Sequence, residues 1–266
     1  MLAVFSLCAL VASWPGVAAA QGIDQSLSNF DVKNNTGQDA NDFHVALGYF
    51  DPANILGLYT GAGGFPNATK SANGSGANCD WSGATVSNGA WAHVGIRLAD
   101  DLDPTDVQMW WTNNGTRIPD GGGGGGGTNT FPDVFQKWNW LTSPDTVRDV
   151  ITNRSGPLTW VQRRVNTSTS VLALPDLMVG GAIWNTATVI DAQPVSIGQN
   201  ASLTYDYLYT GGILSCAMMY DVYLDNGSNA PGLLMMTYLN AAVVTPEPAT
   251  LSLLALGGLA LIRRRR

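Results

Sequence analysis

Aspartate supplies every acidic side chain of this chain but one, and this bias constrains the fold more than any other feature. The sequence holds 20 acidic residues, and Glu247, near the C-terminus, is the one glutamate among them. Glutamate favours helix interiors, whereas aspartate favours turns and helix caps. The chain also holds 31 glycines, with abundant asparagine, threonine and serine. This composition predicts many strands joined by many turns.

Alternation of apolar and polar residues also indicates an all-β fold. Phe43, Val45, Leu47 and Tyr49 alternate with other residue types, which is typical of a strand with one buried face. Further strands are predicted at residues 90–98, 107–112, 158–166, 187–191, 202–209, 213–224 and 233–239. Asn-Gly and similar turn sequences separate them. This spacing predicts a single β-sandwich, immunoglobulin-like or jelly-roll-like.

The middle of the chain carries two other signals. One short helix is expected near residues 131–140 or 144–151. Seven consecutive glycines at 121–127 predict a flexible loop within one domain, because glycine has no side chain to pack. This loop does not match a phosphate-binding P-loop, since no Lys-Ser or Lys-Thr pair follows it.

The N-terminus indicates export. Residues 2–12 are apolar, Pro15-Gly16 interrupts the run, and small residues precede Gln21. An apolar core followed by a small-residue cleavage site predicts a signal peptide over residues 1–20. The body of the protein is therefore expected at residues 21–244.

The last segment, 245–266, has three parts in a fixed order. Pro246-Glu247-Pro248 breaks regular structure, an apolar run follows at 249–262, and the chain closes on four arginines, Arg263, Arg264, Arg265 and Arg266. As a helix the run would be about 21 Å long, against a hydrocarbon core of about 30 Å. It predicts a short transmembrane helix whose arginines stay on the cytoplasmic side.

This tail resembles the PEP-CTERM sorting signal of Gram-negative bacteria. The resemblance implies recognition near Pro246-Glu247-Pro248 by an exosortase, a membrane transpeptidase-like enzyme. It also implies a precursor held transiently in the inner membrane, loss of the tail, and delivery of the body to the cell surface or extracellular matrix. The stretch 34–45 resembles a motif near the N-terminus of exported bacterial β-rich proteins, and no catalytic role comes with it.

The net charge limits which partners the protein can bind, and the cysteines indicate the redox state of its compartment. Outside the tail, nine basic residues face nineteen acidic ones, a balance of about −10. This balance opposes nucleic-acid binding, which needs a basic surface. The body has two cysteines, Cys79 and Cys216, and an isolated pair in an oxidising compartment predicts a disulfide. The alternative is two unpaired thiols.

Residues able to bind a metal give only weak signals. A cluster of aspartates is a weak candidate for Ca²⁺, although its spacing does not match an EF-hand loop: Asp100, Asp101, Asp103 and Asp106. The alternative is a solvated turn between strands. His44 and His93 lie on the polar phase of strand-like segments, without the spacing of a two-histidine metal site. We therefore expect no metal and no cofactor.

Tryptophans are the strongest candidates for a binding site. Four of them lie in two close pairs, and exposed rings of this kind stack on sugars: Trp110, Trp111, Trp138 and Trp140. In a strand, Trp110 and Trp111 must point to opposite faces of the sheet, so one of them is expected in the core. The alternative is that all of these rings belong to the core and its rim.

The sequence predicts an exported, non-enzymatic protein with a structural or adhesive role. Neither a Gly-x-Ser-x-Gly elbow nor a Cys-His constellation marks a catalytic site, and no pair of aspartates stands out as a glycosidase pair. The expected partners are an exosortase and exopolysaccharide or other matrix components. The alternative function is a carbohydrate-binding module that uses exposed tryptophan and aspartate.

Overall fold

The computed structural model describes residues 27–60, 64–99, 102–119, 131, 134–140, 146–154, 158–170, 186–208 and 215–243. All of them lie in one compact unit, Gly22–Val244. They include sixteen strands and the 3-10 helix η1 (Pro52–Asn54), which confirms the predicted all-β class. The predicted signal peptide and C-terminal apolar helix lie outside the described residues. Within the described ranges, no helix is long and apolar enough to cross a membrane.

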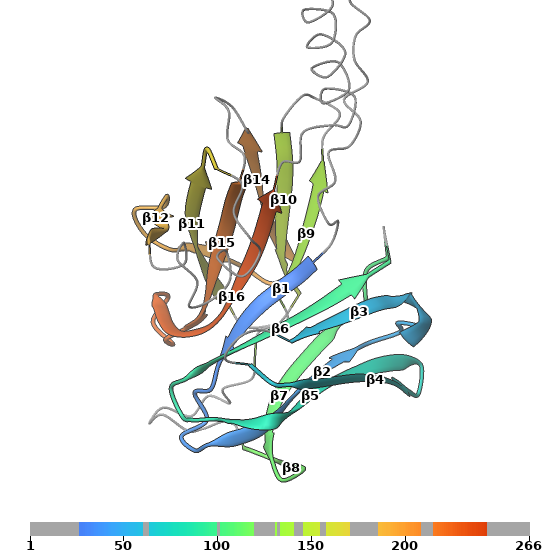
Figure 1. Cartoon of the computed structure of the whole chain (residues 1–266). Helices are drawn as coiled ribbons and strands as arrows, with labels where there is room; N and C mark the ends of the chain where they lie inside the picture. The colour runs from blue at the N-terminus through green and yellow to red at the C-terminus, as the bar shows by residue number, and fades with distance from the viewer. Residues whose placement is uncertain are drawn as a thin grey trace, which may run out of the picture. The chain divides into compact units, whose positions relative to one another are not determined.

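The largest sheet has eight antiparallel strands and joins the first and last strands of the body. Its order is β12 (Thr188–Val189), β11 (Thr159–Ser168), β15 (Ser215–Asp225), β16 (Pro231–Val243), β1 (Leu27–Lys33), β6 (Trp91–Leu98) and β3 (Ile55–Thr60), and β13 (Val195–Ile197) also pairs with β11. Because β1 lies between β16 and β6, the sheet runs without interruption from early to late parts of the chain (Figure 1).

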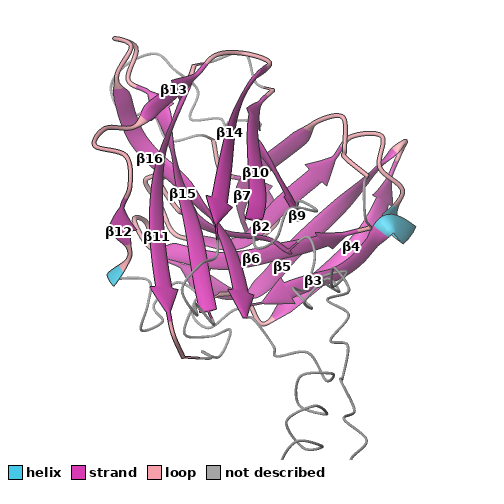
Figure 2. Ribbon diagram, turned by 90° about the horizontal axis from the view of Figure 1, so that it is seen from above, coloured by secondary structure: helices cyan, strands magenta, loops and turns pink. Residues whose placement is uncertain are grey.

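Two smaller antiparallel sheets accompany it. One has five strands in the order β4 (Asn67–Asn73), β5 (Gly76–Val86), β2 (Ala40–Leu47), β7 (Val107–Asn113) and β8 (Thr116–Arg117). The other has three strands in the order β14 (Ala201–Leu208), β10 (Thr146–Asn153) and β9 (Val134–Trp140). Figure 2 shows the three-stranded sheet beside β11 and β15, and the five-stranded sheet beside β3 and β6.

Both smaller sheets pack on the same face of the large sheet. Val32 pairs with Met236 across β1 and β16, so their side chains share a face, and both are fully buried. On this face the Tyr238 hydroxyl donates to the Val134 carbonyl of β9, and Trp81 Nε1 donates to the Tyr59 carbonyl at 2.9 Å. The predicted sandwich thus has one large sheet in one layer, and the two smaller sheets pack against the same face of it.

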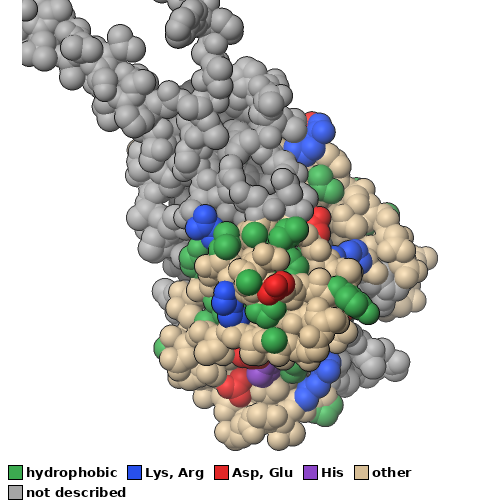
Figure 3. Space-filling model, turned by 90° about the vertical axis from the view of Figure 1, so that its right-hand side faces the viewer, with side chains coloured by type: hydrophobic (Ala, Val, Ile, Leu, Met, Phe, Trp, Pro, Cys, Tyr) green, Lys and Arg blue, Asp and Glu red, His purple; other side chains and the backbone are tan. Residues whose placement is uncertain are grey.

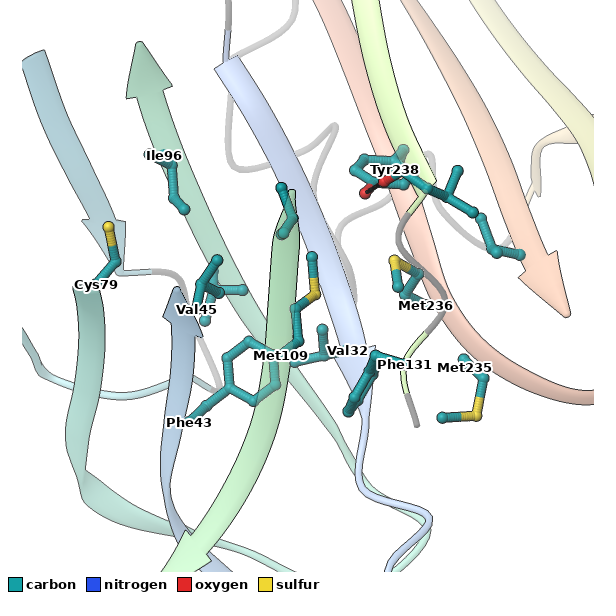
Figure 4. Close-up of a cluster of buried hydrophobic side chains, with 14 of the residues drawn as sticks. Val32, Phe43, Val45, Cys79, Ile96, Met109, Phe131, Met235, Met236 and Tyr238 are labelled. Atoms are coloured by element: carbon teal, nitrogen blue, oxygen red, sulfur yellow. Dashed lines mark hydrogen bonds between the residues drawn. The ribbon is translucent and has the colours of Figure 1, made fainter. Parts of the chain in front are cut away.

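Aromatic residues hold the core together. Phe43 lies 4.8 Å from Trp111, 6.2 Å from Trp81 and 5.7 Å from Phe131, measured between ring centroids. Figure 4 shows Phe131 between Phe43 on one side and Met235 on the other. In the sequence, Phe131 lies between β8 of the five-stranded sheet and β9 of the three-stranded sheet. Its ring therefore connects the early and late parts of the chain in one core.

The expected helix near residues 131–140 or 144–151 is wrong. Both segments are strands, β9 and β10, and they pair with each other from Val134 opposite Asn153 to Trp140 opposite Val147. Four residues of β10 are valine, isoleucine or threonine between positions 146 and 151, and branching at Cβ favours strands.

The glycine run at 121–127 lies outside the described residues, but its flanks are fixed. Ile118 is buried and its N–H donates to the Trp111 carbonyl at 3.0 Å, and Phe131 is buried on the other side. We expect deletion of three or four of these glycines to shift Tm by no more than a few degrees, because loop closure depends only weakly on loop length. Thermal unfolding followed by circular dichroism checks this, and a loss above about 10 °C would contradict it.

Candidate functional site

The outward surface of the five-stranded sheet carries a connected set of polar and aromatic side chains. We call it the polar face and define it by six residues: Asp42, His44, Asp80, Trp110, Thr112 and Arg117. Strand alternation places them there, because their neighbours Phe43, Trp81 and Trp111 point into the core. Pairing then aligns them: His44 is opposite both Asp80 and Trp110, and Thr112 is opposite both Asp42 and Arg117.

His44 is the centre of a hydrogen-bonded chain across the sheet. Its Nδ1 lies 2.6 Å from Asp80 Oδ1, and its Nε2 lies 3.0 Å from Thr112 Oγ1. Since a carboxylate only accepts, Nδ1–H donates to Asp80. The Thr112 hydroxyl also lies 3.0 Å from Asp42 Oδ2, to which it donates. The chain Asp80–His44–Thr112–Asp42 therefore ties β5, β2 and β7 together.

The Trp110 ring lies between the side chains of His44 and Arg117. Its ring is nearly parallel to the His44 ring, with centroids 5.3 Å apart and an interplanar angle of 14°. The Arg117 guanidinium carbon lies 5.4 Å from the Trp110 centroid. His44 is on β2 and Arg117 is on β8, which lie on opposite sides of β7, so the two residues flank the Trp110 ring. Arg117 is exposed, whereas His44 and Trp110 are half-buried.

The distances within the polar face resemble those of a nucleophile, a base and an orienting carboxylate, in the order Thr112, His44 and Asp80. Two features argue against nucleophilic attack by Thr112. The residue is only 4% exposed, and its hydroxyl is shared with Asp42. The arrangement is better suited to fixing the side chains of the face than to attacking a substrate.

The other candidate tryptophans occupy different environments. Trp111 is 2% exposed and belongs to the core. Trp138 and Trp140 lie on β9, but their side chains fall outside the described part of the chain. Of the two pairs, the structure therefore places only Trp110 on an outward surface among the side chains that it describes.

The aspartate cluster proposed for Ca²⁺ is described only in part. Asp100 and Asp101 lie outside the described residues, whereas Asp103 is exposed. Asp106 Oδ1 accepts from the Thr105 hydroxyl at 3.1 Å, and its carboxylate packs where a Cβ on Gly48 would stand. Among the described residues, no three His, Cys, Asp or Glu side chains are grouped so that they could hold a metal ion.

The predicted disulfide is wrong, because Cys79 is a free thiol buried in the core. Cys79 points inward from β5 of the five-stranded sheet. Cys216 lies on β15 of the eight-stranded sheet, opposite Thr167 and Ala242. Spacing along the sequence could not show that the two cysteines belong to different sheets. Burial, and then the Asp80 carboxylate, raise the pKa of the Cys79 thiol to about 12.

Cys79 is therefore expected to resist alkylation in the native protein. In a Cys216→Ser background, iodoacetamide at pH 8 should label the body only after denaturation, which mass spectrometry of the peptides reports. The folded thiol holds its proton to a higher pH than the unfolded thiol, so its contribution to stability is complete below about pH 9 and is lost as the pH rises toward 12. Cys79→Ala should remove this alkaline decrease, and rapid labelling of the native protein would contradict the prediction.

A second polar cluster lies on the face of the large sheet that points away from both smaller sheets. His93 Nδ1 is 2.8 Å from Asp31 Oδ1, and both residues are buried. Among the residues that the structure describes, Asp31 Oδ2 and His93 Nε2 have no hydrogen-bond partner. Burial raises the pKa of Asp31, while the hydrogen bond from His93 and the charges of His93 and Arg164 oppose this shift. Two strands away from Asp31, on β15, Asp221 accepts a bidentate pair of hydrogen bonds from Arg164 of β11.

The β-rich fold of the body occurs together with a sorting motif at the C-terminal end of the chain. Residues 244–266 match the PEP-CTERM protein-sorting motif, so the chain carries the C-terminal tail of exosortase substrates. This motif implies export and membrane-associated sorting. No curated protein matches the sequence.

One solved structure that matches is a transglutaminase from red sea bream, with a TM-score of 0.24 and 14% sequence identity. The match covers 86% of this chain but only 30% of that enzyme. A likeness this low carries no argument about fold or function.

Proposed function

We propose that the body is a non-enzymatic structural or adhesive protein of the cell surface or extracellular matrix. The sorting motif supports the export route, in which the precursor is held at the inner membrane until an exosortase removes the tail. The single observation that supports adhesion is the polar face, where His44 orders hydrogen-bonding side chains from three strands. The layered sheets support a sandwich-like body, of immunoglobulin-like or jelly-roll-like kind.

A carbohydrate-binding module is the second candidate function. Trp110 supports it, because the ring lies on an outward surface together with Asp42 and Asp80. Both flanks of the ring are covered, by His44 and by Arg117, so a sugar would have to displace the exposed Arg117 in order to stack. We therefore place sugar recognition in the hydrogen-bonding groups of the face rather than in stacking.

Intact-mass analysis tests the sorting route. The protein recovered from the surface of a host that contains an exosortase should lack the residues beyond about Pro246. A variant with Pro246, Glu247 and Pro248 all changed to alanine should keep the tail and remain in the membrane fraction. A surface form of the unaltered protein that still ends in Arg266 would instead indicate a permanent anchor.

Binding to immobilised polysaccharides tests the adhesive role. The full chain, purified in a mild detergent, should be retained on at least one matrix polysaccharide and should release no new reducing ends from it. Retention without bond cleavage agrees with the proposal. Release of reducing ends would show a glycosidase, and the absence of retention on every polysaccharide would remove the adhesive role.

A further inference from the structure

Arg117 differs from three other arginines of the body, Arg148, Arg163 and Arg164. Arg148, Arg163 and Arg164 each make paired hydrogen bonds with one carboxylate, those of Asp206, Asp191 and Asp221. Arg117 instead lies over the Trp110 ring, and among the described residues no carboxylate forms an ion pair with it. Its guanidinium is exposed, so its N–H donors face solvent.

Both carboxylates of the polar face have other partners. Asp80 accepts from His44 at 2.6 Å, and Asp42 accepts from Thr112 at 3.0 Å. The hydrogen-bonded chain thus satisfies the acids of the face and leaves its exposed cation available. Guanidinium offers five N–H donors in a planar fork, and two of them match the two oxygens of a carboxylate.

The strand that carries Arg117 is held rigidly. The turn before it has Asn114 and Gly115 at φ angles of 51° and 73°, as a tight hairpin turn requires. The Asn114 N–H donates to Asn41 Oδ1 at 2.8 Å, and Asn41 Nδ2 donates to Asn114 Oδ1 at 3.0 Å. After Arg117, the buried Ile118 anchors the chain. A rigid support of this kind lowers the entropy lost on binding.

We propose that Arg117, seated on Trp110, binds the carboxylate of an acidic sugar in a matrix polysaccharide. This inference rests on the proposed adhesive function and names its substrate class. Trp110 holds the guanidinium in place, and His44 holds Trp110, so both are positioning residues. The ligand carboxylate accepts two hydrogen bonds from Arg117, while its sugar ring lies over the polar side chains of the same face.

The acidic body sets a further condition on this contact. The net charge of about −10 outside the tail repels a polyanion at long range. At physiological ionic strength, charges beyond about 8 Å are largely screened, whereas a guanidinium–carboxylate pair that the bound sugar partly buries is screened much less. We therefore expect binding to persist as salt rises to 0.15 M, unlike non-specific binding through a diffuse basic surface.

Affinity measurements with the full chain in mild detergent test the proposal. The probes are polygalacturonate, its methyl-esterified form, dextran sulfate and neutral dextran, each at about 0.15 M ionic strength. Arg117→Ala should weaken binding to polygalacturonate about 10- to 100-fold, the range for loss of a charge-assisted pair. Arg117→Lys should restore only part of this loss, because an ammonium lacks the fork. Arg148→Ala changes the net charge equally and should have no effect.

The possible results distinguish failure of the Arg117 proposal from failure of the adhesive function. An equal loss in Arg148→Ala, or an unchanged affinity in Arg117→Ala, would overturn the role of Arg117 and leave adhesion standing. Equal dependence of dextran sulfate binding on Arg117 would overturn the choice of a carboxylate. Equal binding of the esterified polymer would do the same. If the unaltered protein binds none of the four polymers, and no other polysaccharide either, both the inference and the adhesive function fail.

Discussion

Asp221→Ala is expected to lower the free energy of unfolding by about 3–5 kcal/mol, the usual cost of removing one partner of a buried ion pair. Asp221 is 5% exposed, and its carboxylate accepts from Arg164 Nε at 2.7 Å, from Arg164 Nη2 at 2.8 Å and from the Thr237 hydroxyl at 2.7 Å. The substitution removes the bidentate acceptor of a largely buried guanidinium. Urea unfolding at 25 °C measures the change through the midpoint and slope.

Asp206→Ala is the matched control. Its partner Arg148 makes the same two-bond pair, with both distances at 2.7 Å, but the two side chains are 42% and 45% exposed. Surface pairs contribute little to stability, since water screens the charges and ordering two long side chains costs entropy, so Asp206→Ala should have a much smaller effect than Asp221→Ala. If the two variants lose similar stability, burial does not determine how much the Asp221 ion pair contributes to the free energy of unfolding.

Strong apolar alternation made several strands predictable from the sequence. Residues 107–112 and 233–239 lie within β7 and β16, and the strand predicted at 90–98 corresponds to β6, Trp91–Leu98. In these segments large apolar residues recur at every second position or form short runs, so the buried face is evident without knowledge of neighbouring strands.

Strand β5 shows why other elements were missed. Its eleven residues, Gly76–Val86, include asparagine, aspartate, serine and glycine, which ordinarily indicate turns. The inward positions are nevertheless Ala77, Cys79 and Trp81, all fully buried. An alternation that counts alanine and cysteine as apolar would have found the strand. Its pairing between β2 and β4 compensates for the low strand preference of its polar residues.

The sequence indicated that single residues of the polar face point outward, but not which of them come together. Alternation placed His44 on the outward side of its strand, which the structure bears out. Asp80 and Thr112 follow His44 by 36 and 68 positions, and no local pattern links residues so far apart. Their meeting depends on the strand order β5-β2-β7, in which neither partner is adjacent to β2 in the chain. Long-range pairing of this kind is the part of a β-fold that local sequence does not specify.

Phe43→Ala should lower the free energy of unfolding by about 3–5 kcal/mol, because it removes a large side chain from a close-packed site. Phe43 is fully buried and contacts Trp81, Trp111 and Phe131, so the cavity has rigid aromatic walls that cannot collapse readily. A typical domain has only 5–15 kcal/mol of stability in total, so the variant should unfold at a much lower urea concentration.

Tyr49→Ala is the control for Phe43→Ala, since it also truncates an aromatic ring but at a position that is 76% exposed. It should change the free energy of unfolding by no more than about 0.5 kcal/mol. The comparison also bears on the polar face, because His44 and Trp110 directly follow and precede the core residues Phe43 and Trp111. If loss of the Phe43 ring shifts the strands, then the folded Phe43→Ala protein, kept well below its Tm, should also bind polygalacturonate less tightly than Tyr49→Ala. Equal stability in the two variants would mean that the aromatic cluster around Phe43 is not a determinant of this fold.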